Sequence, residues 1–122
     1  MIRVVNVKGF RTPEQRAGVV YVGRQFAGWP NSGWGNPYKP RPGFDAVAAY
    51  REHLKRVEAD DPEAFAYVLR VTWDRTEGGA KPLGCWCVDA TAGDGSPVVC
   101  HAQILAELLR ERFVPTPSEG SR

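Results

Sequence analysis

The hydrophobic positions along the chain form two kinds of pattern. Short, nearly continuous apolar runs predict strands, and apolar residues at intervals of three and four predict helices. Residues 2–8 (IRVVNVK), 19–23 (VVYVG) and 82–88 (PLGCWCV) are short runs rich in β-branched or apolar side chains, bounded by glycine or proline. Such runs are typical of buried strands. The sequence therefore predicts three strands.

Apolar side chains recur at intervals of three and four in three other segments, which predicts amphipathic helices. One covers residues 45–58 with Asp45 as N-cap, and a second runs from Asp61-Pro62-Glu63 to about Trp73. The third covers residues 101–113. The side chains expected to face the core are Val47, Tyr50, Leu54, Val57, Phe65, Val68, Leu69, Thr72, Ile104, Leu105, Leu108 and Leu109.

Strands separated by helices predict an α/β fold, and the two helices between the second and third strands suit a crossover between parallel strands. A chain of 122 residues forms one domain. We expect a small single-domain layered fold with a short, mainly parallel sheet and about three helices over residues 1–114. Residues 115–122 (PTPSEGSR) are expected to be a disordered tail.

Residues 24–43 form a long segment without helical or strand period, rich in glycine, proline and aromatic residues. Structureless connections of this length are usually functional or disordered. Disorder is disfavoured here because it would leave several aromatic rings exposed to water. Arg24 is a candidate for holding a phosphate or carboxylate. Asn36 is a candidate for hydrogen-bonding a base or an amide, and Trp29, Trp34 and Tyr38 are candidates for stacking on a planar ligand. The alternative is a lid pinned over the core, with Trp34 buried and Asn36 stabilising a turn.

Every cysteine of the chain lies between residues 84 and 101, and a histidine follows the last of them. Cys85 and Cys87 share one face of the predicted strand because side chains alternate along a strand. We expect Cys100 and His101 to return toward its carboxyl end, where ligands of open α/β sheets bind.

Three interpretations of this cluster compete. Cys85, Cys87, Cys100 and His101 have the ligand types of a Cys₃His zinc site, although their spacing is unusual. Alternatively, Cys100 is a reactive thiolate with His101 as base, because a helix N-terminus and a neighbouring imidazolium lower a thiol pKa, and Cys87 is a further candidate nucleophile. The third interpretation is that the cysteines are small buried side chains.

Charge and cysteine count restrict the setting of the protein. Residues 1–44 carry seven basic residues and one acid, whereas residues 45–122 carry nine basic and thirteen acidic residues. The basic half favours an anionic partner. Three cysteines cannot all pair within one chain, which favours a reducing cytoplasmic compartment, and no apolar run is long enough to span a membrane.

Six segments, in this order, resemble a family of small bacterial and phage proteins that is known as a domain of unknown function with a CWC…CH pattern. This chain has a twelve-residue link, VDATAGDGSPVV, where members of that family have a short proline-containing one. The resemblance implies that Arg24, Gly35, Asn36, Pro37, Cys85, Trp86, Cys87, Cys100 and His101 match the family's motif. The segments are VVNVKG (4–9), VYVGR (20–24), WGNPY (34–38), the helix with Ala49-Tyr50-Arg51, PLGCWC (82–87) and CHAQILAEL (100–108).

Two functions from different classes remain. The first is an enzyme-like domain that binds a nucleotide, nucleoside or nucleic acid at a site formed by the Cys/His cluster, Arg24 and Asn36. The second is a non-catalytic protein-interaction module, such as a phage protein that binds a host protein, in which the cluster or a zinc ion is structural.

Overall fold

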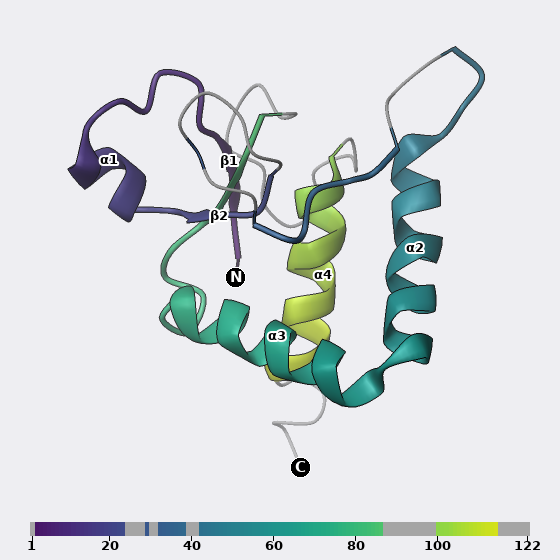
Figure 1. The fold of residues 1–122 in the computed structure, drawn as a ribbon. Helices are drawn as coiled ribbons and strands as arrows, with labels where there is room; N and C mark the ends of the chain where they lie inside the picture. Colours follow the sequence, from purple (N-terminus) through teal and green to yellow (C-terminus); the bar gives the residue numbers. More distant parts are fainter. Residues whose placement is uncertain (1, 24–28, 30–31, 39–41, 87–99, 115–122) are drawn as a thin grey trace, which may run out of the picture.

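The computed structural model describes residues 2–23, 29, 32–38, 42–86 and 100–114. Within them the chain is a small α/β domain, as predicted (Figure 1). The strands are shorter than the sequence suggested. The elements, in chain order, are β1 Val4–Asn6, α1 Pro13–Ala17, β2 Val20–Tyr21, α2 Ala46–Asp60, α3 Pro62–Arg75, β3 Leu83–Cys85 and α4 His101–Phe113.

The three strands form one parallel sheet in the order β1-β3-β2, so β3 lies in the centre. Val20 and Val22 donate to the carbonyls of Pro82 and Gly84 at 2.9 Å each. Gly84 is required in β3, because a Cβ at this position would lie 2.6 Å from Cγ1 of Val7 and 3.2 Å from Cγ2 of Val19. The side chains of Val7 and Val19 therefore pack closely against the middle of the central strand.

Side-chain caps determine where the helices begin. The Asp45 carboxylate accepts from the Ala48 amide at 2.9 Å, and the Asp61 carboxylate accepts from the Ala64 amide at 3.1 Å. Both caps confirm the sequence prediction. The same Asp61 ends α2, so the two helices join without a loop.

Helix α4 is the centre of the helical layer. It packs on β1 and β3 and also contacts α2 and α3 (Figure 1). Leu105 and Leu109 are fully buried there. None of the helices in the described part of the chain is both long and apolar enough to cross a membrane.

Two side chains expected in the core lie outside it: Val57 is 40% exposed and Val68 is 45% exposed. On α2, the side toward α4 follows the i+4 row from Tyr50 through Leu54 to Glu58, and Glu58 pairs with Arg112 of α4. Apolar spacing alone cannot tell whether the i+3 or the i+4 row of a helix faces the neighbouring helix. For this reason the prediction that Val57 and Val68 are buried was wrong.

Candidate functional site

The end of β3 and the start of α4 bring two sulfurs and an imidazole together. Cys85 is the last residue of β3, and its Sγ lies 2.9 Å from Sγ of Cys100. The latter sulfur lies 3.8 Å from Nδ1 of His101. All three residues are buried, with exposed fractions of 0%, 1% and 7%.

Helix capping makes it possible for adjacent residues to face the same cluster. Cys100 is the extended N-cap of α4, with φ −143° and ψ 144°, and its sulfur accepts from the Ala102 amide at 3.4 Å. The Gln103 side chain accepts from the Cys100 amide at 3.0 Å, which completes a capping box. This turn directs the Cys100 sulfur back toward the first turn of the helix, where His101 lies.

A backbone carbonyl fixes the ring of His101. Its Nε2 lies 2.9 Å from the carbonyl oxygen of Val22, the residue after β2. The Tyr50 ring packs edge-on against the imidazole at a centroid distance of 5.2 Å. A carbonyl only accepts, so Nε2 carries the proton of this hydrogen bond.

The two cysteines of the cluster differ in oxidation state. Cys100 is disulfide-bonded in this structure, whereas Cys85 is a buried thiol that takes no part in that disulfide. Within the described residues, no three His, Cys, Asp or Glu side chains are arranged to hold a metal ion. Cys87 and Arg24, both candidates from the sequence, lie outside the described residues.

The other candidate residues of the long segment make contacts within the protein. Trp34 is buried and donates through Nε1 to Oγ1 of Thr72 at 2.9 Å. Asn36 donates to the Ala46 carbonyl at 3.0 Å and accepts from the Tyr38 amide at 2.9 Å. These contacts hold residues 34–38 against α2 and α3.

Tyr50 adds a further link between this segment and the core. Its hydroxyl donates to the Trp34 carbonyl at 2.7 Å, and burial raises the pKa of that hydroxyl. The Tyr38 hydroxyl accepts from the Arg56 guanidinium at 2.8 Å.

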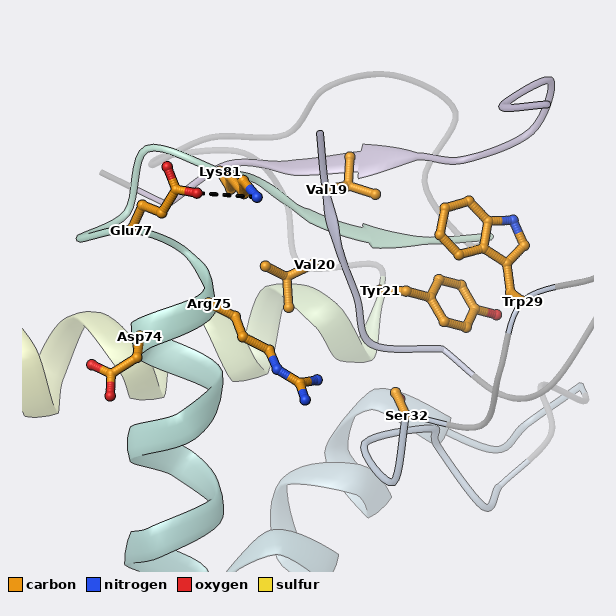
Figure 2. A pocket seen from close by; sticks show the side chains of 9 residues that line it. All are labelled: Val19, Val20, Tyr21, Trp29, Ser32, Asp74, Arg75, Glu77 and Lys81. Atoms are coloured by element: carbon orange, nitrogen blue, oxygen red, sulfur yellow. Dashed lines mark ion pairs between the residues drawn. The ribbon is translucent and has the colours of Figure 1, made fainter. Parts of the chain in front are cut away.

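A hollow of about 670 Å³ lies at the open edge of β2, next to the end of α3 (Figure 2). Tyr21 and Trp29 form its aromatic wall, with ring centroids 4.7 Å apart in a stacked arrangement. Figure 2 shows the Arg75 side chain extending from α3 into the space below Val20. The lining residues are Val19, Val20, Tyr21, Trp29, Ser32, Asp74, Arg75, Glu77 and Lys81.

Sequence reasoning missed this hollow. Arg75 is the last residue of a surface helix, and the two wall residues come from β2 and from the long segment. No local pattern connects these positions. The only available signal was the aromatic content of residues 24–43, which indicated a ligand site without locating its charged partner.

Fold and cluster together define a small α/β domain with a buried Cys/His centre. The chain belongs to the family described as a domain of unknown function, DUF4326, and the sequence model of that family matches residues 5–111. No curated protein and no solved structure matches the chain.

Proposed function

We propose that the protein binds a small anionic ligand with a planar ring, of the nucleotide class, in the hollow beside β2. The observation that carries this proposal is the Arg75 guanidinium, which projects into the hollow that the stacked Tyr21 and Trp29 rings also line (Figure 2). A guanidinium holds phosphate oxygens through paired hydrogen bonds, and an aromatic wall favours a flat, apolar ligand body.

Ion pairs around the hollow leave Arg75 as the charge available to a ligand. Asp74 pairs with Arg70 at 3.2 Å, and Glu77 pairs with Lys81 at 3.0 Å. Within the described residues, Arg75 takes part in no ion pair. The two carboxylates are therefore neutralised by other cations, which supports an anionic ligand.

The size of the hollow also suits this ligand class. Pockets for small molecules and cofactors measure roughly 300–1,000 Å³, and the hollow measures about 670 Å³. Val20 and Tyr21 contribute an apolar floor and wall.

Burial of the cluster supports binding over covalent catalysis. The sulfurs of Cys85 and Cys100 are shielded from solvent, whereas a nucleophilic thiolate must reach its substrate. We assign the cluster a structural role in holding β2, β3 and α4 together, so the proposed function needs no attacking thiol.

Substitution of Arg75 tests the proposal. Arg75→Gln keeps the helix and removes the charge, and Arg51→Gln is the matched control because Arg51 lies on α2 and pairs with Glu107, and neither of these residues lines the hollow. We expect Arg75→Gln to weaken the binding of nucleoside monophosphates at least about tenfold, since charge-assisted hydrogen bonds contribute about 1.5–3 kcal/mol. Arg51→Gln should bind like the unmodified protein.

Isothermal calorimetry with each of the common nucleoside monophosphates, and with inorganic phosphate as a separate titrant, measures these affinities. Binding of phosphate alone with the same affinity would show that the ring is not recognised. If no nucleotide binds, or if both arginine variants bind equally well, the hollow is not the site.

A protein-interaction module is the second candidate function, and one observation favours it. Tyr67 is 71% exposed and Val68 45% exposed on α3. Both line a smaller hollow of about 250 Å³ that shares Val20, Tyr21, Ser32 and Arg75 with the first. Exposed apolar side chains beside a groove are typical of protein contacts.

Val68→Ser and Val57→Ser form a matched pair for this candidate, because both remove an exposed valine from a helix. A partner captured from a bacterial extract by the unmodified protein and by Val57→Ser, but lost with Val68→Ser, would favour the interaction module. Equal capture by all three proteins would argue against this surface.

A further inference from the structure

We infer that the outward side of α3 is the interface of a homodimer, in which α3 packs antiparallel to α3 of a second copy of this chain, about a two-fold axis near Val68. The inference goes beyond the proposed ligand and does not rest on it, although Arg75 belongs to both surfaces. It rests on the apolar side chains of α3, on the smaller hollow beside them and on the charges at the two ends of the helix.

Helix α3 carries apolar side chains on two sides. Phe65 and Leu69 are buried in the core. A second row, which we call the outer stripe, consists of Ala64, Tyr67, Val68 and Val71. Tyr67 is 71% exposed and Val68 is 45% exposed. A surface helix usually carries polar residues on the side away from the core, whereas a helix that is apolar on both sides is usually covered on both.

Helix α2 provides the contrast within the same protein. Its exposed residues between positions 51 and 56 are all charged: Arg51, Glu52, Lys55 and Arg56. In α3, the six residues from Ala64 to Leu69 include no charged side chain, although four of them are exposed. Covering such an apolar surface removes it from water, which favours association.

The smaller hollow, of about 250 Å³, gives this surface a recess beside the outer stripe. Val68 and Val71 line it together with residues of β2 and of the long segment. Aromatic side chains that enter a recess of the partner commonly anchor protein interfaces. With the axis near Val68, Tyr67 of the second copy comes to the level between Val68 and Val71, since successive residues of a helix rise by about 1.5 Å. Its ring then lies next to the rim of the hollow.

The ends of α3 carry opposite charges that antiparallel packing brings together. Glu63 lies in the first turn and Arg75 in the last. Along the helix, Glu63 is about 7.5 Å before Val68 and Arg75 about 10.5 Å beyond it, so Arg75 of one copy comes within about 3 Å of the level of Glu63 of the other. Within the residues that the structure describes, neither side chain takes part in an ion pair.

This charge pattern also indicates a second copy as the partner. A two-fold interface uses the same surface on both subunits, so that surface must be complementary to itself. Helix α3 meets this condition because each copy supplies the carboxylate that faces the other copy's guanidinium. A parallel arrangement would instead place Glu63 beside Glu63 and Arg75 beside Arg75, which like-charge repulsion disfavours.

The contact is small, so we expect a reversible dimer. Stable interfaces bury about 800 Å² on each partner, whereas the outer stripe covers about 12 Å of helix length. The dimer should therefore form as the protein concentration rises, and dilution should return the monomer.

Sedimentation equilibrium of the tag-free full chain tests the inference, in a reducing buffer that removes disulfides between copies. The average mass should rise from 13.5 kDa toward twice that value as the concentration increases to about 1 mM. Val68→Glu should stay monomeric, because a dimer would bury two carboxylates near the axis. Val57→Glu, which changes an exposed valine of α2, should associate like the unmodified protein. Circular dichroism verifies that each variant is folded.

Exchange of the end charges tests the antiparallel arrangement separately. Glu63→Arg and Arg75→Glu should each raise the dissociation constant of the dimer about fivefold, because each places like charges opposite one another. The double variant should restore the affinity, since opposite charges face one another again. No restoration would exclude this arrangement of the two helices.

A chain that is monomeric at about 1 mM would overturn the inference, and so would equal association of Val68→Glu and Val57→Glu. If the chain is monomeric but retains another protein, and Val68→Glu alone loses it, the outer stripe binds a different partner. Neither Val57 nor Val68 lines the larger hollow. A failure to bind nucleotides would therefore leave the dimer standing, and a monomeric chain would leave the proposed ligand standing.

Discussion

A methyl group added at Gly84 should test how tightly the sheet is built. In Gly84→Ala the new Cβ would lie 2.6 Å from Cγ1 of Val7 and 3.2 Å from Cγ2 of Val19. Val7 is 1% exposed, so its side chain has no solvent to move into. Either that valine leaves its rotamer or β1 moves away from β3.

Overpacking of this kind costs about 1–3 kcal/mol, out of a total stability of roughly 5–15 kcal/mol for a domain. A cost of 1 kcal/mol lowers the melting temperature of a domain of this size by about 4 °C. We therefore expect Gly84→Ala to melt about 4–12 °C lower than the unmodified protein.

Urea unfolding followed by tryptophan fluorescence measures the free-energy change, with an unchanged m-value showing that the denatured state is the same. Gly18→Ala is the matched control, since its Cβ would come no closer than 3.4 Å to any atom outside its neighbours. It should alter stability by less than about 0.5 kcal/mol. Equal stability of Gly84→Ala and Gly18→Ala would refute the close packing of β1 on β3.

Three further substitutions test the caps, the long segment and a buried hydroxyl. Trp34→Phe removes the Nε1 hydrogen bond to Thr72 and part of a buried ring, so calorimetry should show a loss larger than the about 1 kcal/mol of the hydrogen bond alone. Asp61→Ala removes the cap of α3 and should cost about 1 kcal/mol in urea unfolding, whereas Asp60→Ala, which removes no cap, should change little. Burial raises the pKa of Tyr50 above its usual value near 10, so the folded state keeps this proton where the unfolded state loses it. Stability should therefore fall as the pH rises above about 10, and Tyr50→Phe should flatten that part of the profile.

Local chemistry explains which parts of the fold were predictable. Asp45 and Asp61 cap their helices by accepting from amides three residues further along the chain, so each cap can be predicted from a short stretch of sequence. The parallel pairing of β2 with β3 followed from the two helices between them. Val57 and Val68 were wrongly predicted because their exposure depends on which row of each helix meets its neighbours.

The Cys/His cluster and the hollow beside β2 depend on contacts between residues far apart in the chain, which the sequence alone does not predict. The pairing of His101 with the Val22 carbonyl joins residues 79 positions apart. The hollow depends on Arg75 meeting Tyr21 and Trp29, which come from separate elements. Sequence position alone brought Cys100 and His101 together, and the N-cap geometry decided that both face the same cluster.

Amide chemical-shift mapping of the full chain with a nucleoside monophosphate tests the central claim most directly, because it locates binding without any substitution. The account predicts saturable shifts centred on Tyr21, Ser32 and Arg75, which surround the hollow. Absence of shifts, or shifts centred on the other hollow that Arg51 of α2 and Glu107 of α4 line, would contradict it.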